Sequence, residues 1–116
     1  MAKLEKTLNE SFDSVLWRID DAVMKSISAT LEDRCDWRTA DARCSVRVYE
    51  RYSYLGGNRV SMNVTLFQAG KGPVKVCAIT SGGSQAMFFK INTLGEETFL
   101  AEAEDALNRH RYRGGN

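Results

Sequence analysis

Proline, histidine and paired cysteines are scarce in this 116-residue sequence, and each scarcity excludes a class of protein. One proline and nine glycines exclude a collagen-like or linker-like chain. The three cysteines are odd in number and lack CxxC spacing, which argues against a disulfide framework and favours free thiols in a reducing compartment. A lone histidine, His110, without paired Cys or His ligands predicts no metal site.

Long apolar runs and a strong net charge are also missing. No stretch approaches the ~20 residues that a membrane-spanning helix needs, and the segment from Met1 to Lys6 lacks the apolar core of a secretory signal. We therefore expect a cytoplasmic protein with no membrane contact. The net charge of +1 gives the whole chain no electrostatic bias toward nucleic acid.

The composition that remains is sufficient for one hydrophobic core. Hydrophobic residues make up 43% of the chain and charged residues 27%, which is ordinary for a globular domain of this length. No internal repeat or low-complexity segment divides the chain. We therefore expect a single domain over residues 1–116, with residues 111–116 as a frayed tail.

Apolar residues recur at helical spacing near both ends of the chain. Over residues 10–25 they lie three and four positions apart, which predicts an amphipathic helix. Near the C-terminus Thr93 and Glu96 have the form of a capping box, and a second apolar stripe runs from Phe99 to Leu107. The sequence therefore predicts one N-terminal and one C-terminal helix.

Between these helices the apolar period changes to two, which indicates strands. The alternation predicts four of them, over residues 27–32, 43–51, 60–67 and 74–81. Residues 33–41 are polar and indicate a loop, while residues 86–91 fit either a fifth strand or a buried run before the last helix. Short turns imply antiparallel hairpins. We expect an α+β two-layer sandwich in the order αββββα, with an antiparallel sheet of four to five strands and both helices packed on one face.

The strand over residues 43–51 carries two kinds of side chain. We expect its small apolar members to face the core: Cys44, Val46 and Val48. Its arginines would then share the opposite face with Tyr49: Arg43, Arg47 and Arg51. A basic sheet face with aromatic side chains can bind single-stranded nucleic acid. The low overall charge argues against that function and favours a solvated face or a protein interface.

That mixed face is the first candidate site. Its expected members are Arg43, Arg47, Tyr49, Phe67, Cys77 and Ile79. Contiguous exposed apolar surface usually marks a partner site, so we expect a homodimer that packs sheet to sheet. The alternative is that isolated apolar side chains on the surface need no explanation.

The glycine-rich loop Ser81-Gly82-Gly83-Ser84-Gln85 is the second candidate site. A glycine pair lets backbone N–H groups turn toward an anion, and the serines add hydroxyl donors. Arg47 or Arg59 would supply charge. The loop lacks the Walker and GxGxxG patterns. An ordinary turn that reverses the chain is the alternative.

No catalytic constellation is present in the sequence. Cys44 is expected in the core, and Cys35 in the polar loop has no identifiable base. Adjacent carboxylates such as Glu96 and Glu97 do not face each other on a helix, so they form no acid–base pair. The sequence assigns no catalytic residue and no cofactor, and it favours a non-enzymatic role.

Two stretches of the chain have a distinctive amino-acid sequence. They are RYSYLGGNRVSMNVTLF, from Arg51 to Phe67, and ITSGGSQAMFFKINT, from Ile79 to Thr93. Together with the opening MAKLEKTL they resemble a small family of bacterial proteins catalogued only as a domain of unknown function. The resemblance covers nearly the whole chain and implies a bacterial origin, but no catalytic residue, cofactor or partner.

These observations leave two functional hypotheses. The leading one is a non-catalytic binding or assembly module that self-associates through its sheet. The alternative is a site for a small anionic molecule, enzymatic or not, formed by the Ser81–Gln85 loop and nearby arginines.

Overall fold

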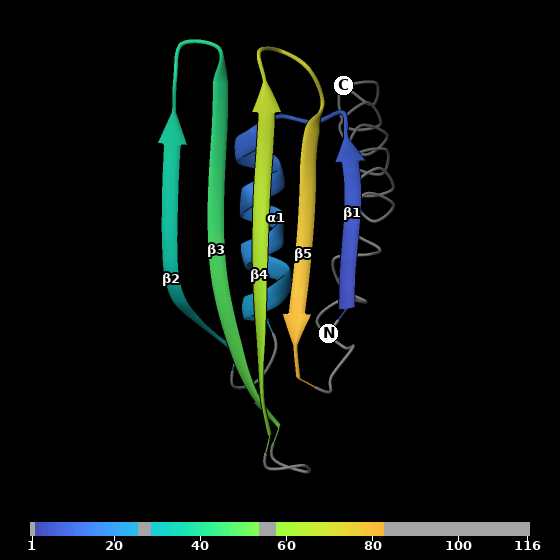
Figure 1. The fold of residues 1–116 in the computed structure, drawn as a ribbon, viewed down its shortest axis with the longest axis vertical. Coiled ribbons are helices and arrows are strands. Elements are labelled where there is room, and N and C mark those ends of the chain that lie inside the picture. Colours follow the sequence, from blue (N-terminus) through green and yellow to red (C-terminus); the bar gives the residue numbers. More distant parts are fainter. Residues whose placement is uncertain (1, 26–28, 54–57, 83–116) are drawn as a thin grey trace, which may run out of the picture.

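A computed structural model describes residues 2–25, 29–53 and 58–82 of the chain. Six elements follow one another: β1 (Ala2–Leu8), α1 (Phe12–Met24), β2 (Ala29–Arg38), β3 (Ala42–Ser53), β4 (Asn58–Ala69) and β5 (Val74–Ser81). Figure 1 shows α1 behind a single five-stranded sheet. The prediction of an α+β chain with an N-terminal helix and an antiparallel sheet is confirmed.

The strands lie in the order β1-β5-β4-β3-β2, and every neighbouring pair is antiparallel. Strands β2 to β5 form consecutive hairpins, and β1 adds to the free edge of β5. Strands β1 and β2 therefore lie at opposite edges, and the chain crosses from one edge to the other through α1 (Figure 1).

The helix α1 begins where the sequence supplies a cap. The Ser11 hydroxyl accepts a hydrogen bond from the Ser14 backbone N–H at 3.1 Å, which satisfies one orphan donor of the first turn. Asp13 in that turn suits the positive end of the helix dipole. Within the described residues, no helix has the length and hydropathy required to cross a bilayer.

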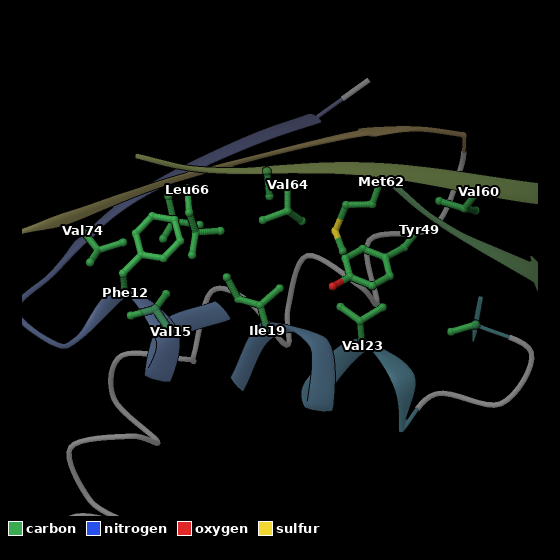
Figure 2. Close-up of a cluster of buried hydrophobic side chains, with 13 residues drawn as sticks. Phe12, Val15, Ile19, Val23, Tyr49, Val60, Met62, Val64, Leu66 and Val74 are labelled. Atoms are coloured by element: carbon green, nitrogen blue, oxygen red, sulfur yellow. The ribbon is translucent and has the colours of Figure 1, made fainter. Parts of the chain in front are cut away.

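The hydrophobic core lies between α1 and the face of the sheet toward it, which we call the inner face. The helix contributes Phe12, Val15, Ile19 and Val23, all buried. They pack against buried residues of the sheet, chiefly Val60, Met62, Val64, Leu66, Val74, Val76 and Ala78 (Figure 2). Each fully buried aliphatic or aromatic side chain contributes about 1.5–3 kcal/mol relative to an exposed one.

Strand β1 is an element that the sequence analysis missed. Leu4 and Leu8 lie opposite Ala78 and Val74 and pack against the core. The fifth strand of the sheet is therefore β1. The predicted strand at 86–91 and the predicted C-terminal helix lie outside the described residues.

The predicted loop over residues 33–41 is wrong for its first six residues. Strand β2 continues through them to Arg38, after a register shift between Leu31 and Asp33. Every residue of β2 after Ala29 is exposed. Polar side chains suit this edge strand because β3 is its one neighbour in the sheet.

The predicted facing of β3 is also wrong. Cross-strand partners share a face, and β3 residues 45, 47 and 49 lie opposite Leu66, Val64 and Met62. Ser45, Arg47 and Tyr49 therefore point to the inner face, and all three are buried. The small apolar side chains lie on the other side of the sheet, the outer face, where they are half-buried: Cys44, Val46 and Val48.

Candidate functional site

A run of arginines crosses the inner face where β2 and β3 pair. The register places Arg38 opposite Arg43 and Arg34 opposite Arg47, with Asp36 opposite Ser45 between them. We call these six residues the arginine ladder. Like charges directly opposite on one sheet face repel each other, so each arginine pair favours a nearby anion.

The middle of the ladder is internally neutralised. Asp36 accepts a hydrogen bond from the Ser45 hydroxyl at 2.5 Å, and its Oδ1 lies 3.0 Å from Nη1 of Arg47. The same Arg47 nitrogen donates to the Val46 carbonyl at 2.9 Å, and 9% of the Arg47 side chain is exposed. The Ser45 hydrogen bond, and then the Arg47 guanidinium, hold the pKa of Asp36 below its ordinary value. Arg47 therefore has a structural role, because its guanidinium is bonded within the sheet.

The ladder end nearest the β2–β3 turn is only partly neutralised. Arg43 Nη2 lies 2.7 Å from Asp13 Oδ1, and its guanidinium carbon stacks 4.1 Å from the centre of the Phe12 ring. This hydrogen bond lowers the pKa of Asp13, and the charges of Arg43 and Arg38 lower it further. Arg38 and Arg34 form no ion pair with a carboxylate in the part of the chain that the structure describes.

A second polar contact joins the sheet to the helix. The hydroxyl of the fully buried Tyr49 donates to Asp20 at 3.1 Å. Burial, together with the negative charge of Asp20, raises the pKa of Tyr49 above its ordinary value. A phenol that holds its proton so firmly is a poor acid or base near neutral pH. We assign this pair to fold stability.

The outer face carries an exposed apolar surface that no described element covers. Its large members, Trp37, Phe67 and Ile79, are 64%, 42% and 40% exposed. Smaller half-buried side chains connect them: Cys44, Val46, Val48 and Cys77. The register places Trp37, Cys44 and Phe67 side by side in one row across the sheet. We call these seven residues the outer-face patch.

The interface residues expected from the sequence divide between the two faces. Phe67, Cys77 and Ile79 lie together on the outer face. Tyr49 is fully buried, so its predicted exposure is wrong. Arg43 and Arg47 lie on the inner face, bonded to carboxylates.

The residues of the expected anion loop do not converge on Arg47. Arg59 lies on the outer face and pairs with Glu50 at 3.2 Å, whereas Arg47 lies on the inner face. Gly82 has a φ of +106° and packs so closely on β4 that a Cβ there would lie 3.0 Å from the Arg59 carbonyl oxygen. Ser81 pairs with Ser61 at the end of β5, while Gly83, Ser84 and Gln85 lie outside the described residues.

The three cysteines share the outer face. Cys35 lies opposite Val46, Cys44 opposite Trp37, and Cys77 opposite Thr65. Cys44 is therefore not the core residue that we expected. In the described segments, no group of three or more His, Cys, Asp or Glu side chains is arranged to hold a metal ion.

The sequence matches one known protein family over nearly its whole length. The model of the family of unknown function DUF6054 matches residues 1–111. The chain belongs to this family. The resemblance to an uncharacterised family is thus confirmed, and no curated protein or solved structure matches the chain. The function of DUF6054 is unknown.

Sequence analysis missed three residues that matter for these surfaces: Trp37, Asp36 and Asp33. All three fall in the segment assigned to a loop because it is polar. A signal was available, since residues 33–38 alternate between two faces, with Arg34, Asp36 and Arg38 on one and Asp33, Cys35 and Trp37 on the other.

Proposed function

We propose that this chain is a non-catalytic assembly module in which two copies pair through the outer faces of their sheets. The observation that carries the proposal is the outer-face patch, with three large apolar side chains exposed by 40% or more. Single exposed apolar side chains are ordinary on protein surfaces. A contiguous group of them usually marks a partner surface.

The charges beside the patch favour a second copy as the partner. One row runs straight across the sheet from Asp33 on β2, through Val48, Asn63 and Ile79, to Lys3 on β1. The row therefore ends in a carboxylate on one edge strand and an ammonium group on the other. This arrangement is complementary to itself.

The symmetry of a homodimer uses this complementarity directly. Two sheets can pack face to face about a two-fold axis that runs along the central strand, β4. Such an axis exchanges the two edges of the sheet, so that Lys3 of each copy lies over Asp33 of its partner. Phe67, on β4, then meets its own copy near the axis. The flexible lysine stem accommodates the ~30° rotation between packed sheets.

The size of the face also fits a homodimer. Five strands ~4.8 Å apart and about eight residues long give the sheet face a flat area of roughly 600 Å². The side chains that protrude from this face increase its accessible area. Standard interfaces bury about 800 Å² per partner.

Reversal of the edge charges tests the proposed register. Lys3→Glu or Asp33→Lys alone should place like charges opposite each other twice per dimer and weaken dimerisation by tenfold or more. The double variant should recover the affinity because it restores both pairs in reversed polarity. Lys6→Glu, on the other face of β1, is the matched control and should leave the affinity unchanged. Sedimentation equilibrium measures each dissociation constant.

A central substitution tests the face itself. Phe67→Asp places a charge at the proposed axis, while an exposed position keeps the effect on folding small. We expect a folded monomer. A wild-type protein that stays monomeric up to millimolar concentration, or a dimer unaffected by Phe67→Asp, would refute the assembly proposal.

A further inference from the structure

A depression lies at the end of the inner face where the β2–β3 and β4–β5 turns meet. This open depression has a volume of about 450 Å³. This volume lies within the range of small-molecule sites, roughly 300–1,000 Å³. The side chains that decide its chemistry are Arg38, Thr39, Asp41, Arg43, Gln68 and Lys71. The depression is separate from the outer-face patch, because Arg43 and Gln68 pair across the inner face.

The lining of this depression is positively charged. It holds three cations and one carboxylate, Asp41. Arg43 is already bonded to Asp13. Arg38 and Lys71 have no carboxylate partner within the described ranges. These two cations remain available to a ligand.

Backbone hydrogen bonds hold the two turns beside these cations. The Thr39 N–H donates to the Ala42 carbonyl at 2.9 Å, which closes the β2–β3 turn. The Gly70 N–H donates to the Asp41 carbonyl at 2.6 Å, which ties the two turns together. Gly70 has a φ of +57°, a conformation that glycine adopts without strain. Arg38, at the end of β2, and Lys71, in the β4–β5 turn, therefore lie at turns that are bonded to each other, and little loop ordering opposes binding.

We propose that this depression binds a phosphate group of a small ligand, with Arg38 and Lys71 as the principal contacts and Arg43 behind them. A guanidinium matches two phosphate oxygens with parallel N–H donors, and an ammonium adds a compact charge. A phosphate monoester carries nearly two negative charges at neutral pH, and Arg38 and Lys71 supply two positive charges that no carboxylate in the described residues pairs. The anion would also reduce the repulsion between the guanidinium groups of Arg38 and Arg43, which lie directly opposite each other.

The rest of the ladder favours a single phosphate group over a nucleic-acid strand. A strand needs a continuous track of available cations. The carboxylate of Asp36 lies next to Arg38 in the ladder. The ion pair with Asp36 neutralises Arg47, so its charge is not available to a nucleic-acid phosphate. Asp36 also separates Arg38 from Arg34, which has no ion pair among the described residues, so the available cations do not form a continuous track.

Calorimetric titration with pyrophosphate, at constant ionic strength in chloride, tests the site. We expect the double variant Arg38→Gln, Lys71→Gln to bind at least tenfold more weakly than the wild-type protein. Lys75→Gln removes an exposed lysine from β5, outside the depression, and should leave the affinity unchanged. In amide NMR spectra the largest shifts should fall on Thr39, Asp41 and Lys71.

Two further measurements separate the sources of the phosphate. Binding to vesicles that contain phosphatidic acid, lost in the double variant, would assign the site to a lipid headgroup. Binding of pyrophosphate without retention on vesicles would assign it to a soluble ligand. No binding of either probe, or equal loss in Lys75→Gln, would overturn the proposal. Lys3→Glu should not affect pyrophosphate affinity, so the phosphate site and the dimer stand or fall separately.

Discussion

The buried hydroxyl of Tyr49 makes stability at high pH a direct test of the inner-face packing. Tyr49→Phe keeps the ring and removes the hydrogen bond to Asp20, which should cost about 1–2 kcal/mol at pH 7, because the partially solvated Asp20 recovers water in its place. The assay is urea unfolding of both proteins from pH 7 to pH 11.5.

The sign of the pH effect follows from the raised pKa of Tyr49. In the unfolded chain the phenol has its ordinary pKa of 10.0, whereas in the folded protein the pKa is higher. The stabilisation is therefore fully present below pH 10 and is lost as the pH rises above it, because the unfolded chain releases the proton first. At pH 11 the loss amounts to about 1.4 kcal/mol, since each pH unit above the unfolded pKa is worth 2.303RT. The wild-type protein and Tyr49→Phe should then have nearly equal stability.

The contribution of Asp20 can be separated from that of burial. Burial is the largest cause of the raised pKa of Tyr49, and the charge of Asp20 comes second. Asp20→Asn should therefore keep most of the alkaline loss. A stability difference between the wild-type protein and Tyr49→Phe that stays constant from pH 8 to pH 11.5 would refute the burial of this hydroxyl.

Three more predictions concern the core, the turns and the ladder. Ile19→Ala should destabilise the protein by about 2–5 kcal/mol in urea unfolding, because the side chain is fully buried against the sheet. Gly82→Ala should cost more than Gly70→Ala in the same assay, because both have positive φ but only the former would bring a Cβ against the backbone of β4. Asp36→Asn should reduce the loss of stability in acid: the lowered pKa of Asp36 stabilises the fold above pH 3.8, and that contribution disappears as the pH falls below it. Urea midpoints at pH 6 and pH 3 measure the last effect.

Local periodicity was sufficient to predict α1, β4 and β5. The helical stripe gave the helix to within about two residues of its bounds. In β4 and β5 the alternating residues from Val60 and from Val74 are the buried ones, as the aliphatic pattern indicates. Each of these elements presents one apolar face to one layer, so its own sequence contains the signal.

Edge strands carried a weaker signal. In β1 the leucines that pack against the core, Leu4 and Leu8, are separated by charged and polar residues, so the segment does not look like a strand that must be buried. β2 is polar on both faces after Ala29, so its pattern resembles a loop. Their pairing depends on long-range partners, β5 and β3, that local composition does not specify.

The inverted facing of β3 has a geometric cause. A single helix is about 10 Å wide and covers two or three strands of a sheet roughly 20 Å across. Figure 1 shows α1 behind the middle of the sheet, with β2 beyond it at the edge. The inner side of β3 therefore passes from the core at Tyr49 to the polar ladder at Arg47 and Ser45.

The valines of β3 consequently point away from the helix and are half-buried on the outer face. Under the proposed dimer they are buried after all, because the second copy covers the outer face. In that arrangement Val46 and Val48 belong to the core of the assembly, while Ser45 and Arg47, which alternate with them, face the helix side of the sheet. The pattern of β3 then follows from the two-copy unit, in which each face of the strand has its own partner.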